Sequence, residues 1–156
     1  MRNKQKGFSL IELLIVVAII LIIAAIAIPN LLRSKMAANE ASAVGSLRTL
    51  NTACVTYSTT YGTGYPANLA NLGPGAPATA ATADLIDGVL AGGTKSGYTF
   101  AYAAGAAVGG QIPTYTITAD PVNRGTTGQR GFFTDQSGVI RANPTATATA
   151  ASPPIS

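Results

Sequence analysis

The stretch FSLIELLIVVAIILIIAAIAI, residues 8–28, decides the architecture of this chain. Its 21 residues are apolar except for Ser9 and a single carboxylate, Glu12. As an α-helix the stretch would be about 31 Å long, close to the roughly 30 Å hydrocarbon core of a bilayer. A lone charge near the bilayer centre costs roughly 2.5 to 3.5 kcal/mol. The stretch therefore predicts a membrane-spanning helix in which Glu12 needs a specific explanation.

Basic residues flank this apolar segment on both sides. Arg2, Lys4 and Lys6 precede it, whereas Arg33 and Lys35 follow it. With the initiator amine added, the N-terminal side carries more positive charge, and the positive-inside rule then favours a cytoplasmic N-terminus. The bulk of the chain would be exported.

The net charge of +4 belongs mainly to the N-terminus. Ten basic residues face six acidic ones, and three of the ten precede Phe8. Without those three, seven basic residues face six acidic ones, which is a net of +1. The remaining basic residues are scattered rather than clustered, so the charge gives no support for a nucleic-acid partner.

Two general interpretations of the N-terminal segment stay open on composition alone. A cleaved secretory signal would combine the basic start, the apolar run and Ala25-Ile26-Ala27 as an A-x-A cleavage site. A plain signal anchor would keep the whole segment in the membrane. Glu12 would be a handicap inside the apolar region of a secretory signal.

A more specific signal lies at the start of the apolar run. The short basic leader MRNKQKG ends in Gly7, and FSLIE, residues 8–12, follows before the long apolar helix. In these residues the sequence resembles the type IV pilin and pseudopilin family. Members of that family are cleaved after a short leader, and the resemblance holds at the residue before the cleavage point (Gly7), the residue after it (Phe8) and the glutamate (Glu12). The resemblance covers residues 1–55 strongly and the remainder only in architecture.

This resemblance implies how the chain is processed and assembled. A prepilin peptidase on the cytoplasmic face would cut between Gly7 and Phe8, and Phe8 would become an N-methylated terminus. Further implied partners are an inner-membrane assembly platform and other copies of the chain in a helical filament; no cofactor is implied. The chain would be a single-pass inner-membrane protein with a periplasmic headpiece before assembly, and then part of a surface pilus or a periplasmic pseudopilus.

Glu12 has two compatible explanations. Ser9 to Glu12 fit the S-x-x-E pattern of a capping box, and a first-turn glutamate suits the positive end of the helix dipole. The family resemblance adds that Glu12 neutralises the N-terminal amine of a neighbouring subunit during assembly. After a cut before Phe8, Glu12 would lie only about 6 Å along the helix from the new terminus, near the interface. In an apolar bundle its carboxylate needs a partner of opposite charge.

The helical pattern continues beyond the apolar run. Pro29 removes one helical hydrogen bond and crowds the preceding turn, so we expect a kink or local melting there. Beyond it, apolar residues recur at helical spacings: Leu32, Met36, Val44, Leu47, Leu50, Cys54 and Tyr57. Polar residues, Glu40 among them, are expected mostly on other faces. We predict one long helix over residues 8–57, a continuity that counts against a secretory signal.

The rest of the chain predicts a small headpiece of α+β class. Alternating residues predict strands at 97–102 and 114–118, and residues 130–135 with 139–141 predict a hairpin. A three- or four-stranded antiparallel meander of this size cannot hold a core alone, and the apolar stripe of the helix offers the missing surface. The expected division begins with a prepilin leader (1–7), a transmembrane or filament-core helix (8–29) and an amphipathic spine (30–61). A loop (62–96) follows, with one helical turn near residues 84–90. A sheet (97–142) and a disordered tail (143–156) complete the chain.

The sequence lacks the residues that most catalytic and metal sites require. It has no histidine and one cysteine, Cys54, which we expect to be a small buried residue. No P-loop, dinucleotide fingerprint, zinc spacing or catalytic triad occurs. The carboxylates Asp84, Asp87, Asp120 and Asp135 are too dispersed to predict a calcium site.

We therefore predict a structural protein and not an enzyme: a subunit of a type IV pilus-like filament. A pseudopilin of a type II secretion system is the alternative. A soluble domain released after Ala27 is a third and less favoured possibility.

Overall fold

The structure is a computed structural model, and it describes residues 7–155. Most of the expected leader, residues 1–6, lies outside this range. The chain divides into two compact units, Met1–Lys35 and Met36–Ser156. The first unit contains the apolar half of a long helix, and the second contains the headpiece.

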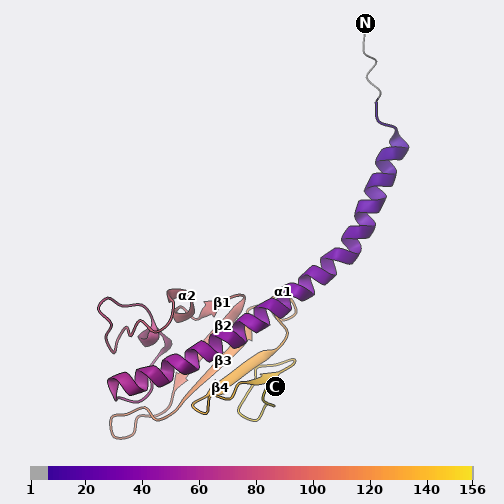
Figure 1. Cartoon of the computed structure of the whole chain (residues 1–156). Coiled ribbons are helices and arrows are strands. Elements are labelled where there is room, and N and C mark those ends of the chain that lie inside the picture. The colour runs from indigo at the N-terminus through magenta and orange to yellow at the C-terminus, as the bar shows by residue number, and fades with distance from the viewer. Residues whose placement is uncertain (1–6, 156) are drawn as a thin grey trace. The chain divides into compact units, whose positions relative to one another are not determined.

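Helix α1 (Leu10–Tyr61, 52 residues) supplies both the apolar segment and the spine of the headpiece (Figure 1). The prediction of one long helix is confirmed, with the start at Leu10 rather than Phe8 and the end at Tyr61 rather than Tyr57. Pro29 lies inside α1, and the helix is not melted there. A kink at Pro29 stays a prediction.

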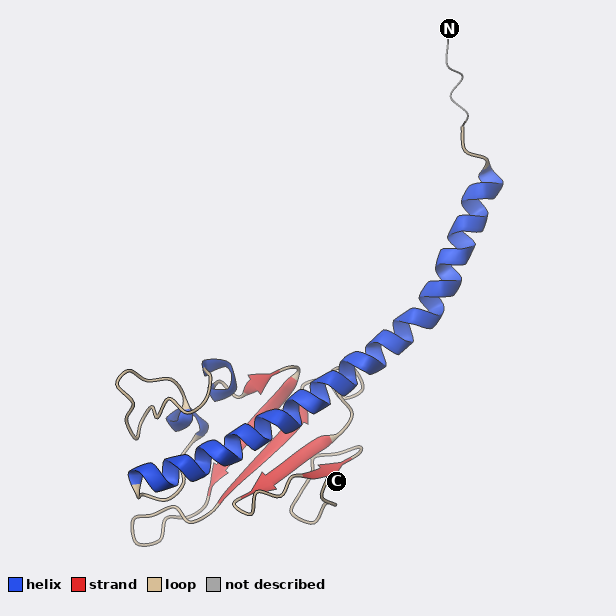
Figure 2. Ribbon diagram, in the orientation of Figure 1, coloured by secondary structure: helices blue, strands red, loops and turns tan. Residues whose placement is uncertain are grey.

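The headpiece sheet has five strands, one or two more than predicted. Its order is β1-β2-β3-β4-β5 with antiparallel neighbours throughout (Figure 2). Strands β2 and β3 are the long ones, and the register sets Tyr102 opposite Ile117 and Ile117 opposite Thr134. The strand bounds are β1 (Thr94–Lys95), β2 (Tyr98–Ala104), β3 (Tyr115–Pro121), β4 (Gly131–Asp135) and β5 (Arg141–Asn143).

The second half of α1 lies across one face of this sheet (Figures 1 and 2), and the core forms between them. The helix contributes Leu47, Leu50, Cys54 and Tyr57, as its apolar spacing predicts. The facing strand residues are Tyr98, Phe100, Tyr115, Ile117 and Phe132. The α+β class and the helix-on-sheet packing are thus confirmed.

The segment between α1 and the sheet is more ordered than a free loop. It contains a 3-10 helix, η1 (Leu69–Leu72), and a short helix, α2 (Gly88–Ala91). Leu69, Leu72 and Ala83 join the hydrophobic core, so the expectation of an exposed loop over residues 62–83 is wrong there. The expected helical turn forms as α2, where the Asp87 side chain accepts the Leu90 N–H at 2.9 Å.

The C-terminal strap, residues 144–155, corrects the expectation of a disordered tail. It returns antiparallel to β5, where Ala142 N–H donates to Pro153 O at 3.0 Å and Ile155 N–H donates to Ile140 O at 2.9 Å. Ala148 is only 1% exposed. The strap passes so close to Gly131 that a Cβ there would lie 2.5 Å from Ala146 O. Contacts with the sheet therefore hold the strap in place. The pattern of apolar residues within the strap sequence carries no information about such contacts.

Candidate functional site

The predicted processing and assembly residues lie together at the start of α1. The Ser9 N–H donates to Glu12 Oε2 at 2.9 Å, and the Leu13 N–H donates to Ser9 O at 3.2 Å. The first of these bonds is one of the two hydrogen bonds that define a capping box. The structure therefore contains half of the capping box that was predicted for Ser9 and Glu12. The carboxylate thereby fixes the point where the chain enters the helix.

Gly7 and Phe8 are accessible at this end of the chain. The Phe8 side chain is 86% exposed. At Gly7, leaving out its chain neighbours, no heavy atom of the described residues lies within 4 Å of the place where a Cβ would be. The backbone between the two residues is therefore open to another macromolecule.

The apolar half of α1 presents its side chains outward on all sides. Every large hydrophobic residue from Leu10 to Leu32 belongs to the exposed set. Among the helices of residues 7–155, α1 is the one long and apolar enough to cross a membrane. Apolar surface on this scale needs lipid or protein around it. The segment thus suits membrane anchoring or burial among similar helices.

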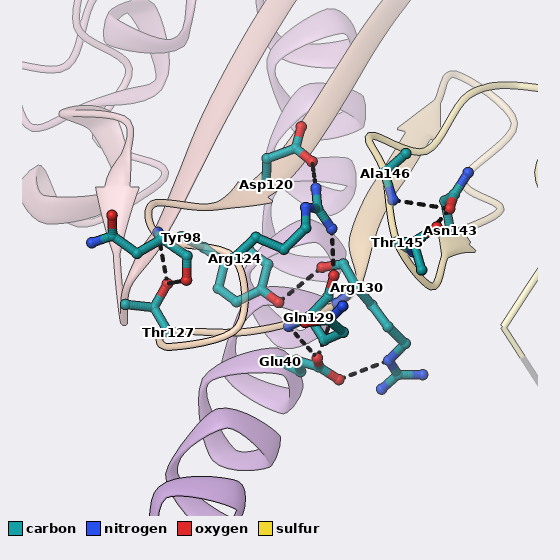
Figure 3. Close-up of polar contacts among 11 residues, drawn as sticks. Glu40, Tyr98, Asp120, Arg124, Thr127, Gln129, Arg130, Asn143, Thr145 and Ala146 are labelled. Atoms are coloured by element: carbon teal, nitrogen blue, oxygen red, sulfur yellow. Dashed lines mark hydrogen bonds and ion pairs between the residues drawn. The ribbon is translucent and has the colours of Figure 1, made fainter.

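A second polar cluster, which the sequence did not predict, lies where α1 meets the β3–β4 connection (Figure 3). Glu40 is 9% exposed. It accepts hydrogen bonds from Gln129 N at 2.9 Å, Arg130 N at 3.1 Å and Arg130 Nε at 2.7 Å. One carboxylate thus joins the helix to a connection that lies far away in sequence.

The neighbours of this cluster hold the connection in shape. Arg124 pairs with Asp120 at 3.0 Å and also donates to Gln129 O, while the Tyr98 hydroxyl donates to Arg130 O at 2.9 Å (Figure 3). Burial opposes ionisation of Glu40, but the two backbone N–H donors and the Arg130 guanidinium outweigh it and lower its pKa. The cluster is a structural clamp between the helix and the connection.

The thiol and two tyrosine hydroxyls of the headpiece core are desolvated. Cys54 is a free, buried thiol, as expected, and desolvation raises its pKa to about 12. Desolvation also raises the pKa values of Tyr102 and Tyr115, whose rings stack at 5.8 Å. Within residues 7–155 no three His, Cys, Asp or Glu side chains gather as metal ligands. The headpiece core is therefore built for packing.

Comparisons with known proteins match limited parts of the chain. A family model described as the prokaryotic N-terminal methylation motif matches residues 2–28. A type IV wide pilus major component from Thermus thermophilus is 65% identical over 40 residues, which are 26% of this chain and 30% of that protein. A type IV major fimbrial protein from Dichelobacter nodosus is 50% identical over 58 residues, 35% of this chain and 37% of that protein. A type IV major pilin from Myxococcus xanthus is 50% identical over 50 residues, 32% of this chain and 23% of that protein.

These relatives match about a quarter to a third of this chain. No solved structure matches the chain significantly. The chain spans less than two fifths of the length of each of these relatives. Type IV pilins are structural subunits and not enzymes. The methylation motif and the pilin relatives together support the type IV pilin family for this chain.

Proposed function

We propose that this chain is a structural subunit of a type IV pilus, cut between Gly7 and Phe8 by a prepilin peptidase and assembled through α1. One observation carries the proposal: the Gly7-Phe8 junction and Glu12 stand at the start of a wholly exposed apolar helix, within a matched methylation motif. The accessible backbone at the junction suits cleavage. The exposed apolar helix suits both the membrane and a filament core.

Glu12 is the residue that we propose for assembly. Cleavage would place a positive amine on Phe8, about one helical turn from the Glu12 carboxylate. In a bundle of apolar helices, that carboxylate would pair with the Phe8 amine of a neighbouring subunit, since a buried charge needs a partner. The contact is heterologous and does not close, so it generates an open helical polymer.

Removal of the leader would also ease extraction from the membrane. Arg2, Lys4 and Lys6 leave with it. Each basic residue costs roughly 2.5 to 3.5 kcal/mol at the bilayer centre. The mature terminus would retain one amine, which Glu12 balances. The proposed order is insertion with a cytoplasmic N-terminus, then cleavage and methylation, and then transfer to an assembly platform in the inner membrane.

The N-terminal residue of the mature protein tests the cleavage. We expect N-terminal sequencing or intact mass to give a chain that begins at Phe8 and carries one methyl group. A start at Ile28 would instead identify a secretory signal, and a start at Met1 a plain anchor. Gly7→Leu should accumulate as uncleaved precursor, because a side chain would occupy the space that the protease needs. Normal processing of this variant would contradict the proposed peptidase.

A type II secretion pseudopilin shares the same N-terminal features, and the known relatives favour the pilus. Electron microscopy of the cell surface separates the two. A pilus subunit should give surface filaments that an antibody against the headpiece decorates. Loss of protein secretion in a deletion strain without loss of surface filaments would identify a pseudopilin.

A further inference from the structure

We propose that Arg33 and Lys35 bind the phosphate groups of anionic phospholipids and thereby fix the depth of α1 in the membrane. The inference rests on the proposed function in one respect, because it takes the chain as membrane-inserted with Phe8 as its terminus. It names a ligand, the lipid headgroup, for two residues that the assembly proposal leaves without a role.

Neither cation has a charged or hydrogen-bonded side-chain partner within the described part of the chain. Arg33 and Lys35 are exposed, and neither has an ion pair or side-chain hydrogen bond in residues 7–155. The cations of the headpiece behave differently. Lys95, Arg124 and Arg130 each pair with a carboxylate. Arg141 donates to Ser152 O. Among residues 7–155, only Arg48 shares the unpaired state of Arg33 and Lys35.

The position of the two cations matches the headgroup layer. Arg33 comes five residues after Ile28, the last residue of the apolar run, or about 7.5 Å along the helix. The headgroup layer on each side of the hydrocarbon core is about 5 to 7.5 Å thick, from a total thickness of about 40 to 45 Å and a core thickness of about 30 Å. Lys35 lies about 3 Å further, within reach of the same layer because a lysine stem can extend back toward the phosphates.

The other end of the segment gives the same depth. Phe8 lies 25 residues before Arg33, a helical distance of about 37 Å. This is close to the separation of the two headgroup layers, which flank a hydrocarbon core of about 30 Å. With Arg33 at one layer, the Phe8 amine reaches the other, and Glu12 lies one turn inside it. Depth set by Arg33 and Lys35 thus keeps Glu12 near an interface rather than at the bilayer centre.

The two cations take separate lipids. Successive residues of an α-helix are about 100° apart, so Arg33 and Lys35 point about 160° away from each other around α1. A single bidentate anion site is therefore excluded. Each side chain reaches a different headgroup, which holds the helix from two sides.

The experiment measures bound lipid on the full mature chain. Protein released in mild detergent is mixed with phosphatidylglycerol or phosphatidylcholine, and native mass spectrometry gives the fraction that retains lipid. The double variant Arg33→Gln/Lys35→Gln removes both cations, and Arg48→Gln is the matched control, an exposed unpaired arginine further along α1. Both variants change only exposed side chains, and circular dichroism verifies that they remain folded.

We expect the double variant to bind phosphatidylglycerol about fivefold more weakly at each of the two sites, from about 1 kcal/mol per cation at an anionic surface and 1.4 kcal/mol per factor of ten. Arg48→Gln should bind like the wild type. Both proteins should retain phosphatidylcholine less than phosphatidylglycerol, a preference that the double variant should lose. Unchanged retention by the double variant, or an equal loss in Arg48→Gln, would overturn the proposal. Competition by millimolar inorganic phosphate would also overturn it, because it would indicate a free-anion site.

The same samples separate this inference from the proposed cleavage. If lipid retention falls in the double variant but the chain begins at Met1, the phosphate contacts hold and the cleavage proposal fails. If the chain begins at Phe8 and retention is unchanged, the cleavage holds and the lipid contacts are refuted.

Discussion

Replacing Glu40 by glutamine tests whether the buried clamp holds the headpiece together. The substitution keeps the size of the side chain and removes its charge. The carboxylate now accepts two backbone N–H groups and Arg130 Nε at 2.7 Å. In the variant one amide oxygen must serve the backbone donors, and the NH2 group faces the guanidinium. At least the bond to Arg130 is lost.

The expected cost follows from that bond. A hydrogen bond to a charged group contributes about 1.5 to 3 kcal/mol. The Arg130 side chain is 48% exposed, so water recovers part of the loss. We expect Glu40→Gln to lower the free energy of unfolding by about 1.5 kcal/mol. For a unit of this size Tm should fall by about 5 to 8 °C. Glu40→Ala, which leaves both backbone N–H groups without an acceptor, should cost more, about 3 kcal/mol.

Thermal unfolding of the full chain in detergent, followed by the near-ultraviolet signal of its six tyrosines, gives Tm. The control is Asp87→Asn, which removes an exposed ion pair of similar length, 2.9 Å, and keeps a good N-cap. Similar falls in the two variants would refute the argument from burial. The pKa of Glu40 lies below its ordinary 4.5, so its contribution is complete above that pH and is lost as pH falls through the lower value. Wild type and Glu40→Gln should therefore converge in acid.

Three further predictions address assembly, the strap and the core. Glu12→Ala should insert into the membrane at least as well as the wild type but form no filaments by electron microscopy; normal filaments would rule out the pairing role. Ala148→Asp places a charge at a site that is 1% exposed, which should detach the strap. Amide exchange at Ala142 and Ile155 should then become fast, and protection as in the wild type would show that the strap tolerates the charge. With a pKa near 12, Cys54 should resist thiol reagents at pH 8 until the headpiece is denatured; rapid labelling of the folded protein would contradict its burial.

Periodicity predicted those parts of the fold that depend on neighbours in sequence. The spacing of Leu47, Leu50 and Cys54 identified the buried face of α1, and alternation around Tyr98 and Ile117 located the two long strands. Both signals arise because a helix or strand that covers a core must repeat its apolar residues with its own period. The strand β1 and the strap give no such signal, since a two-residue strand is too short for a period and the strap is ordered by distant contacts.

Glu40 shows a different kind of failure. Its position, seven residues before Leu47 and four after Met36, lies on the apolar stripe of α1. A charge at a core position is a signal for a buried partner, but the sequence does not say which of several arginines supplies it. Arg130, the partner in the structure, is brought near by the sheet rather than by any local pattern. Prediction of the pair would have required the fold.

The two edges of the sheet affect whether headpieces that lie close together can aggregate by strand pairing. Wherever many copies of a headpiece lie side by side, an open edge strand could form backbone hydrogen bonds with the edge strand of the next copy and cause aggregation. On one side β1 is only two residues long and contains Lys95. On the other side the strap closes β5 with Pro153 and Pro154, which have no N–H to offer a further strand. Both rims discourage strand addition, so contacts between copies are left to other surfaces, the exposed apolar helix first among them.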